Sequence, residues 1–485
     1  MVRLTKFVFL AVIFVCPACI RPAVHAETKS PVGQSLDSNR ADGVWQSDGF
    51  GYVMQIDNGT ARFFHATPDV CIEPDNDDLK LEDVFEVYRF SDRDTMFTSS
   101  LTEPFEFKFS RIADVPTLCS DASDERIKGT AKALMSFLDT HYVFFDERSV
   151  DRDQIFADIT RASLEESDEA SFFAAITNIL SRTEDAHVEL SGTIDGDALR
   201  FDADPGMIRR LITLRAAKNG TTENEERTAF LQKFWAEGIG EEILKGRSAT
   251  AANDRIRYGI IDGNIGYIAV RSMGGFVAAD SSDGETEAEV LSNIMDRAIA
   301  EFDRVRARAV ILDISINSGG YGYLSRQLAG RFFDKRRQVY QVYAGDAQDQ
   351  TPQSMFVEPE GRSQFIGPVY VLTSSETVSA AESLTMSMRA RPGVTHAGGT
   401  TRGALSTKLA KLLPNGWELM LSNQVVLDHE GSIWEANAAP PHLPIFVFPE
   451  RTIQDEDLLR IDFREAHKSA VDELVAEVRN RINAE

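Results

Sequence analysis

The chain has few basic residues and few cysteines for its size. Its 485 residues include 51 Lys and Arg against 76 Asp and Glu, which gives a formal net charge of -25. A surface this acidic repels phosphate backbones, so we expect no nucleic-acid partner. The chain also lacks Lys/Arg-rich runs, heptad repeats, internal repeats and low-complexity tracts. Its length fits two to four globular domains.

Cysteine is limited to four positions, and two of them, Cys16 and Cys19, lie in the first 26 residues. The remaining pair, Cys71 and Cys119, is a candidate disulfide if the chain reaches an oxidising compartment, and two buried thiols are the alternative. Neither is followed by a Cys or His at metal-ligand spacing. We therefore expect no metal site.

The only signal for membrane targeting is at the N-terminus. Arg3 and Lys6 precede the apolar run FVFLAVIFV, and the small residue Ala26 follows, a pattern typical of a secretory signal over residues 1–26. The apolar run is too short to span a bilayer, so we expect export, with the periplasm as the expected location and no stable membrane span afterwards. A transmembrane anchor, or lipid attachment at Cys19, is the alternative.

Changes of pattern divide the rest of the chain. Short apolar runs that alternate with turn residues such as Asp57-Asn58-Gly59 predict a small β domain over 27–122. Apolar residues at helical spacing predict a helical segment over 123–254. Buried strands such as RAVILDIS and GPVYVLTS, with an amphipathic helix before them, predict an α/β core over 255–450. A C-terminal helix is expected over 451–485.

The passage VYVLTSSETVSAAES places a serine between a strand and a helix. The strand is predicted to end at Thr373 and the helix to begin near Ser379. Unpaired N–H groups at a helix N-terminus can stabilise an oxyanion, so this is a suitable position for a nucleophile. Ser379 and Glu382 also match the capping-box spacing. On local sequence alone, a helix cap is the favoured interpretation.

The passage ILDISINSGGYGY places Gly319-Gly320 after a second buried strand. Paired glycines let the backbone approach a ligand or turn sharply. A phosphate-binding loop is disfavoured, because no Gly-Lys-Ser/Thr ending or dinucleotide spacing is present. A simple tight turn remains the alternative.

Four passages together are similar to those of tail-specific, or C-terminal processing, serine peptidases. ILDISINSGG, TVSAAES, HAGGTTRGALS and GSIWEANAAPPHLPI occur in the family's order and at about its spacing, and the stretch ending in TEDAHVEL resembles the helical segment before the core of many relatives. The resemblance covers residues 124–448. It implies an α/β fold with a crotonase/ClpP-like spiral core, here combined with the N-terminal helical segment and the small β domain.

The resemblance also implies roles for the two motifs. In the family, the serine of a Ser-Ala-Ser/Ala-Glu segment attacks the substrate carbonyl, and here that residue is Ser379. The oxyanion hole would use the backbone N–H of Ala380 and that of a glycine in the pair Gly319-Gly320. The joint match reverses the preference for a helix cap.

One branch of the family has a lysine base in a Gly-Lys-Gly segment 25 residues after the serine, and this chain has Ala404 there. Lys408 and Lys411 are out of register, and we expect both on the surface of a strand. The chain instead resembles the branch of the tricorn protease core, whose base is a histidine that His187 matches. Histidine, with an ordinary pKa near 6.5, can accept the serine proton at neutral pH.

Glu435, in the passage WEAN, falls where the tricorn-like branch carries a glutamate that orients the histidine. That branch has a serine directly before the histidine, whereas this chain has Ala186. We therefore expect His187 to meet Glu435 directly, through water, or through another hydroxyl such as Ser181 or Thr183.

Residues 188–254 look mostly helical and lack the PDZ domain with which many relatives capture free C-termini, so strict tail specificity is not expected. The sequence predicts an exported serine endopeptidase that acts on peptides or proteins without a cofactor, and it leaves the oligomeric state open. The alternative is a carrier of apolar ligands on the same fold, as in interphotoreceptor retinoid-binding protein. Ser379, His187 and the glycine pair favour the enzyme, and Ala186 favours the carrier.

Overall fold

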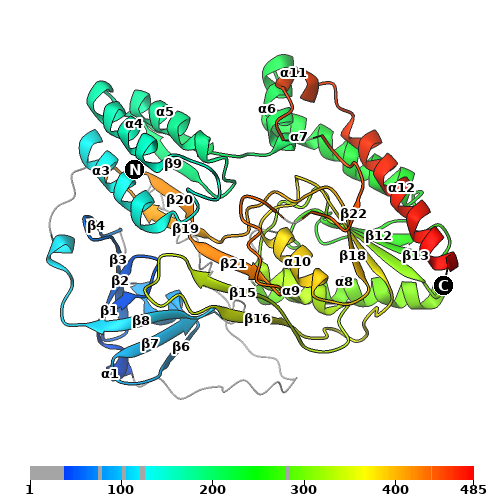
Figure 1. The fold of residues 1–485 in the computed structure, drawn as a ribbon, viewed down its shortest axis with the longest axis horizontal. Helices are drawn as coiled ribbons and strands as arrows, with labels where there is room; N and C mark the ends of the chain where they lie inside the picture. The colour runs from blue at the N-terminus through cyan, green and yellow to red at the C-terminus, as the bar shows by residue number, and fades with distance from the viewer. Residues whose placement is uncertain are drawn as a thin grey trace. The chain divides into compact units, whose positions relative to one another are not determined.

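The computed structural model describes residues 38–74, 79–100, 105–120, 126–278, 284–438, 440–449 and 451–484. The expected signal over residues 1–26, with Cys16 and Cys19, lies outside the described residues. Among the residues that the structure describes, no helix is both long enough and apolar enough to cross a membrane. The chain folds into two compact units (Figure 1). Unit 1 comprises residues up to Ala203 with 343–351 and 407–424, and unit 2 comprises 204–342, 352–406 and 425 onward.

An eight-stranded antiparallel sheet forms the N-terminal part of unit 1, in the order β4-β3-β2-β1-β8-β7-β6 with β5 paired to β3. Asn58 and Gly59 both have positive φ and form the two-residue turn between β2 and β3, as Asp57-Asn58-Gly59 predicted. The elements are α1 (Ser38–Ala41), β1 (Gly43–Ser47), β2 (Tyr52–Asp57), β3 (Thr60–Ala66), β4 (Cys71–Ile72), β5 (Leu79–Lys80), α2 (Leu81–Val84), β6 (Val87–Phe90), β7 (Thr95–Ser99), β8 (Phe107–Ile112) and η1 (Thr117–Ser120).

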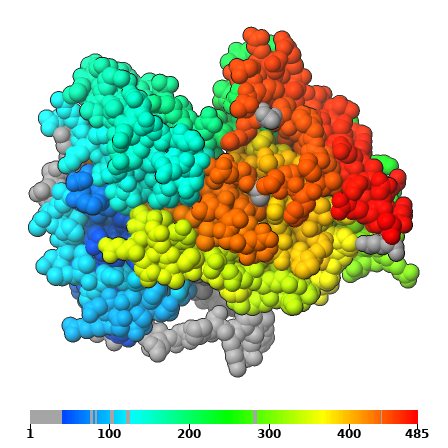
Figure 2. Space-filling view, viewed as in Figure 1, coloured from blue at the N-terminus to red at the C-terminus, as the bar shows by residue number. Residues whose placement is uncertain are grey.

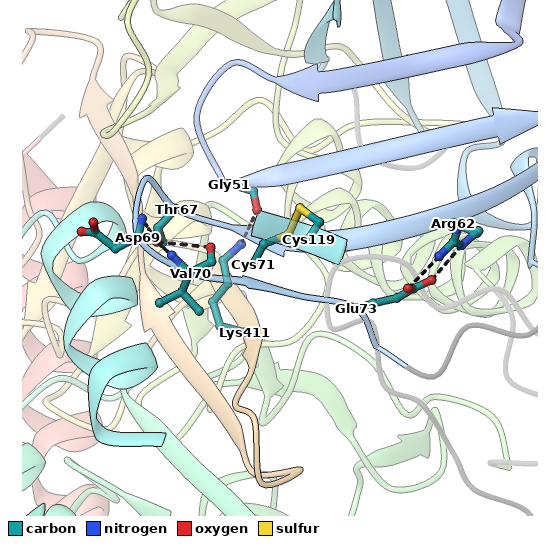
Figure 3. The surroundings of a disulfide bond; sticks show 9 residues. All are labelled: Gly51, Arg62, Thr67, Asp69, Val70, Cys71, Glu73, Cys119 and Lys411. Atoms are coloured by element: carbon teal, nitrogen blue, oxygen red, sulfur yellow. Dashed lines mark hydrogen bonds and ion pairs between the residues drawn. A yellow bond between two sulfur atoms is a disulfide. The ribbon is translucent and has the colours of Figure 1, made fainter. Parts of the chain in front are cut away.

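A disulfide joins Cys71 of β4 to Cys119 of η1 (Figure 3), with the two Cα atoms 4.8 Å apart. Cys71 packs in a small apolar cluster with Val44, Val53 and Phe64. The bond thus fastens the end of the β domain onto the strand at the edge of its sheet.

Three helices and a second sheet complete unit 1. The sheet has the order β10-β9-β20-β19 and combines two hairpins from distant parts of the chain. The elements are α3 (Ile127–His141), α4 (Arg152–Glu165), α5 (Glu169–Leu180), η2 (Ser181–Thr183), β9 (Glu189–Ile194), β10 (Asp197–Asp202), β19 (Lys408–Leu412) and β20 (Glu418–Ser422). The expected core range 255–450 is therefore interrupted, because β20 pairs with β9.

The β9–β10 hairpin lies in the range 188–254 that was expected to be mostly helical. Asp195 and Gly196 both have positive φ, and Ile194 pairs with Asp197 across them. An Asp-Gly dipeptide between two runs of alternating character is a type I′ hairpin signal, and it outweighs the helical pattern that follows.

Lys411 is fully buried, so its expected place on a strand surface is wrong. Its Nζ donates to the carbonyl oxygen of Gly51 (Figure 3) and to that of Phe50. It also lies 4.2 Å from the centroid of the Tyr52 ring. Burial lowers the pKa of Lys411 to about 7, and nearby Asp346 acts in the opposite direction. The alternation of residues along β19 misleads here because both faces of this strand are covered. Lys408 is half-buried and forms an ion pair with Glu189.

Asp346 ties three segments of unit 1 together. Its carboxylate contacts His141 Nδ1 of α3 at 2.5 Å and accepts bonds from the Phe50 N–H at 3.1 Å and Asn423 Nδ2 at 2.8 Å. Burial acts to raise the pKa of Asp346, but these hydrogen bonds hold its pKa below the ordinary value, and the contact with His141 contributes most. The segment 343–351 is thereby fixed to the β domain and to the β19–β20 region.

Unit 2 is built on a seven-stranded sheet, order β11-β12-β13-β14-β17-β18-β22, whose strands from β13 onward are parallel. This arrangement confirms the predicted α/β core. The elements are α6 (Met207–Asn219), α7 (Glu223–Leu231), η3 (Gln232–Ile243), β11 (Ala249–Ala251), β12 (Ile256–Ile261), β13 (Ile265–Val270), α8 (Gly284–Val305), β14 (Ala309–Asp313), α9 (Gly322–Gly330), β15 (Arg337–Ala344), β16 (Gln353–Val357), β17 (Val369–Thr373), α10 (Ala380–Arg389), β18 (Val394–Gly398), β21 (Gln424–Asp428), β22 (Leu443–Pro444), α11 (Asp455–Leu458) and α12 (Phe463–Ala484).

The C-terminal helix α12 closes one face of this sheet. Phe463, Val471 and Leu474 join η3 residues and the strand residues Tyr267 and Ile311 in one buried cluster. The opposite side of α12 is open to solvent (Figure 2). The residues predicted as a separate C-terminal helix are thus part of the core of unit 2.

Lys411 provides a test of the buried cluster in unit 1. Because the folded pKa is about 7, below the ordinary 10.5, the unfolded chain binds a proton between these values that the folded chain does not, and stability should rise with pH across this window. We expect Lys411→Met to reduce this slope by up to about 1.4 kcal/mol per pH unit in urea unfolding. Lys408→Met, on the same strand, should keep the wild-type slope, and equal slopes in all three proteins would contradict the assignment.

The disulfide provides a second test. It closes a loop with a sequence separation of 48 residues. Loop-closure entropy predicts that the double variant Cys71→Ser/Cys119→Ser loses about 4 kcal/mol of unfolding free energy. Urea unfolding should then be sensitive to reductant in the wild type and insensitive in the variant. A wild type that ignores reductant would show that the bond does not form.

Candidate active site

The two sequence motifs meet at one edge of the unit 2 sheet. β14 and β17 are parallel neighbours, with Val310 opposite Val369 and Asp313 opposite Leu372. The turn with Gly319-Gly320 follows β14, and the turn with Ser379 follows β17. The carboxyl ends of adjacent parallel strands lie at the same edge, which is where α/β sheets bind ligands.

Ser379 is held in a backbone conformation that a helix cap does not need. It is the N-cap residue of α10, with φ +61° and ψ -124°, whereas ordinary N-caps are extended with negative φ. This is a region that L residues avoid, and occupying it costs on the order of 1–3 kcal/mol. The Ser379 N–H donates to the Ala404 carbonyl at 3.0 Å and to Glu382 Oε2 at 3.1 Å. The strained turn is thus enforced by its surroundings.

Glu382 is the buried carboxylate that organises this turn. It completes a capping box with Ser379, and it also accepts the N–H groups of Gly403 at 2.7 Å and Ala404 at 2.9 Å. Burial raises the pKa of Glu382, and the hydrogen bonds to its oxygens oppose that shift. The segment that carries Ala404 is therefore fixed against the serine turn, and Ala404 itself is buried.

Gly319 touches the serine. A Cβ on Gly319 would lie 2.7 Å from Ser379 Cβ and 2.8 Å from the Val378 oxygen, and its φ is +81°, so only glycine fits. The Gly319 N–H donates to Asn317 Oδ1 at 2.9 Å. Across the described residues, the N–H groups of Gly320 and Ala380 have no hydrogen-bond partner. Of the glycine pair, Gly320 is therefore the better candidate for an oxyanion donor.

Asn317 connects the glycine turn to the sheet and to the serine turn. Its Nδ2 donates to the Val270 carbonyl at 2.9 Å, and its own carbonyl accepts the Val378 N–H at 3.1 Å. The Thr377 hydroxyl donates to the Ile314 carbonyl at 2.9 Å. Both turns are thus held to one another by buried bonds.

Asp313, the last residue of β14, anchors the start of the glycine turn. Its Oδ1 accepts the Ser315 N–H at 3.0 Å and hydroxyl at 2.7 Å, and its Oδ2 contacts Tyr267 OH and His467 Nε2, the latter at 2.7 Å. Burial acts to raise the pKa of Asp313, but His467 and the hydroxyl donors hold its pKa below the ordinary value. Through His467, helix α12 is joined to the turn beside the serine.

His187 belongs to unit 1, where it lies in the turn before β9 and is buried. The backbone N–H of His187 donates to Asp185 Oδ1 at 2.9 Å. Asp185 is itself fixed by Tyr142 OH at 3.1 Å and by an ion pair with Arg148 Nε at 3.1 Å. A buried carboxylate thus shapes the backbone that carries His187.

The two hydroxyls considered as relays are already donors within unit 1. Ser181 Oγ donates to the Asn178 carbonyl at 2.8 Å, and Thr183 Oγ1 donates to the Leu180 carbonyl at 2.8 Å. A proton relay through either would require its bond to the helix to break.

Glu435 belongs to unit 2 and is buried. Its Oε2 accepts the N–H groups of Leu405 at 2.8 Å and Ser406 at 2.9 Å. Together with Glu382, it leaves the four successive N–H groups of residues 403–406 each bound to a carboxylate oxygen. Glu435 therefore shapes the segment next to Ser379, a role that the sequence did not reveal.

A comparison with protein families matches residues 264–445 to the model described as Peptidase family S41. The chain contains a peptidase family S41 domain. That domain includes Ser379, Ala380, Gly319, Gly320 and Glu435, and the chain is accordingly a serine-type peptidase of the hydrolase class. His187 lies outside the matched range.

Three solved structures illustrate what the chain is similar to. A candidate peptidase from Parabacteroides merdae superposes with a TM-score of 0.52 at 22% identity, over 73% of this chain and 96% of that chain. Mature CPAF gives 0.49 at 12% identity, over 73% and 98%. The photosystem II D1 C-terminal processing protease gives 0.39 at 13% identity, over 70% and 98%.

Two interactions that support the glycine turn were not predicted. Asn317 stands two residues before a glycine in NSGG, which is a recognisable Asx-turn pattern. Asp313 and His467 lie 154 positions apart in the sequence, so no local pattern predicts their contact.

The strain at Ser379 can be measured with a matched pair of variants that both lack the hydroxyl. Glycine accepts φ +61° and ψ -124° freely, whereas alanine does not. We expect Ser379→Gly to be more stable than Ser379→Ala by about 1 kcal/mol in urea unfolding, after the larger entropy of glycine in the unfolded chain is counted. A more stable alanine variant would show that the turn is unstrained.

Proposed function

We propose that this S41 peptidase is an exported endopeptidase that cleaves peptide bonds through an acyl-enzyme on Ser379. The observation that supports this most strongly is the strained serine at the N-terminus of α10, touched by Gly319 and next to two backbone N–H groups, those of Gly320 and Ala380, without a partner in the described residues. A helix cap requires neither the strain nor the adjacent donors.

In the acylation step, Ser379 Oγ attacks the substrate carbonyl carbon, and His187 accepts the hydroxyl proton as the C–O bond forms. The negative charge on the carbonyl oxygen is stabilised by the Gly320 and Ala380 N–H groups, which are preorganised because both turns are fixed by buried bonds. His187 then gives the proton to the leaving nitrogen as the C–N bond breaks. The amine product departs and leaves an ester on Ser379.

In the deacylation step, water gives a proton to His187 and attacks the ester carbonyl. The same N–H groups hold the second oxyanion, and the proton returns to Ser379 Oγ as the carboxylic acid product leaves. Neither step requires a cofactor.

In this proposal, Glu435 orients the His187 ring and stabilises its protonated form, directly or through water. Both backbone bonds to Glu435 described above end on the same oxygen, Oε2. Because Ala404 occupies the position of the lysine base in the other branch, His187 is the base that the mechanism needs.

Export to the periplasm is supported by the signal-like residues 1–26, and also by the disulfide between Cys71 and Cys119, since such bonds persist in oxidising compartments. Lipid attachment at Cys19 is the alternative. The substrates we propose are peptides and proteins, with cleavage that does not depend on a free C-terminus.

The nucleophile is tested by labelling with a fluorophosphonate probe and by hydrolysis of an unstructured protein such as casein. Ser379→Ala should abolish labelling at this residue and lower hydrolysis by roughly 10⁴- to 10⁶-fold, with an unchanged circular dichroism spectrum. Ser383→Ala, four residues further along α10, should behave as the wild type. Retained labelling or turnover in Ser379→Ala would rule out the proposal.

The base is tested in the same assays. His187→Gln should remove hydrolysis to a similar extent, because the Ser379 hydroxyl then has no proton acceptor. His429→Gln, which changes an exposed histidine, serves as the control. Full activity in His187→Gln would show that another group acts as the base.

A further inference from the structure

Two tyrosines follow the glycine turn directly. Tyr321 comes immediately after Gly320 and remains 39% exposed, although most large apolar side chains of unit 2 are buried. Tyr323 lies behind it, with the two ring centroids 5.5 Å apart and the planes tilted by 37°. The Tyr323 hydroxyl donates to the Gly284 carbonyl at 3.1 Å. An aromatic surface therefore stands beside the candidate oxyanion donor.

The Tyr321 ring has a fixed position. The Tyr321 N–H donates to the Met273 carbonyl at 2.7 Å, and the Met273 N–H donates to the Gly319 carbonyl at 2.7 Å, so the turn is bonded to the neighbouring segment on both sides of Gly320. A Cβ on Gly274 would lie 2.8 Å from Tyr321 Cδ2 and 3.0 Å from Cε2. The ring thus rests on a bare backbone that only glycine provides.

This surface is also uncharged. Burial raises the pKa of the Tyr321 phenol, and the negative charge of Glu287 raises it further. The ring therefore stays neutral over the working range of a serine peptidase. The face of an uncharged aromatic ring attracts apolar side chains and, because it is electron-rich, repels a carboxylate.

Tyr321 lies close in the chain to the glycine that contacts Ser379. Gly319 is in contact with Ser379, and two residues of extended chain span at most about 7 Å, so Tyr321 lies within the reach of one substrate side chain. The residue whose carbonyl is attacked has its oxygen at the Gly320 N–H in the proposed mechanism. Its side chain branches from the next atom along the chain, and is therefore the substrate group nearest to Tyr321.

We propose that Tyr321, backed by Tyr323, determines specificity by forming an apolar subsite for the side chain of the residue whose carbonyl is attacked. The preferred substrates are then peptides with leucine, phenylalanine or a similar apolar residue at that position. This inference rests on the proposed function, since it assumes that Ser379 is the nucleophile.

The test uses matched peptides that differ only at this residue, with Phe, Leu, Gly or Asp. In the wild type, kcat/KM should be about 10- to 100-fold higher for Phe and Leu than for Gly, and lowest for Asp. Tyr321→Ala should lower kcat/KM for the Phe and Leu peptides to about the value for the Gly peptide, whereas Tyr321→Phe should keep the preference. Phe446→Ala, which removes another exposed aromatic ring, is the matched control.

Two further measurements separate this inference from the proposed function. Fluorophosphonate labelling of Ser379 should persist in Tyr321→Ala, because the probe needs only the nucleophile and the oxyanion donors. The inactive variant Ser379→Ala should bind the Phe and Leu peptides with lower dissociation constants than the Gly peptide. The double variant Ser379→Ala/Tyr321→Ala should bind all three peptides with similar dissociation constants.

The inference is overturned if the wild type and Ser379→Ala show no preference for apolar residues, or if Tyr321→Ala lowers kcat/KM equally for all four peptides. If the probe does not label Ser379 in the wild type but the peptides still bind in the expected order, the proposed role of Ser379 as nucleophile is rejected and the proposed subsite is retained.

Discussion

The carboxylate of Glu382 is the interaction on which the geometry of unit 2 at Ser379 depends. It is buried, yet it accepts the N–H groups of Ser379, Gly403 and Ala404. An unpaired buried carboxylate would be strongly destabilising, so the three donors and the carboxylate require one another. Their bonds offset the backbone strain at Ser379. The conformation of the turn that carries Ser379 is therefore a property of the folded unit and not of the local sequence.

The segment 403–406 shows what this arrangement excludes. Its four N–H groups point to Glu382 and Glu435, and the Ala404 carbonyl accepts the Ser379 N–H at 3.0 Å. The backbone here serves as part of the support of the serine, and the buried Ala404 side chain brings no base to it. A chain with this segment has to draw its proton acceptor from elsewhere, which agrees with the proposed role of His187.

Much of the fold could be predicted because it is encoded locally. Buried runs such as VYVLT, the turn at Asn58-Gly59 and the serine at the start of α10 depend on a few adjacent residues. The burial of Lys411 could not be predicted, since it depends on carbonyl groups more than 350 positions away. The positive φ of Ser379 was equally hidden, because non-local hydrogen bonds impose it. The turn at Asp195-Gly196, by contrast, could have been predicted from that dipeptide, but the helical pattern of the residues after it was given more weight.

The construction of unit 1 from three stretches of chain has a consequence for the order of folding. The β domain and its disulfide lie within one continuous stretch and can form while the chain is still emerging. The sheet that follows His187 cannot, since Glu189 meets Lys408 only across 219 positions. Contacts of such sequence separation form late, because the intervening chain must first be made and ordered. Unit 1, which holds His187, is thus completed only after most of the polypeptide has been synthesised.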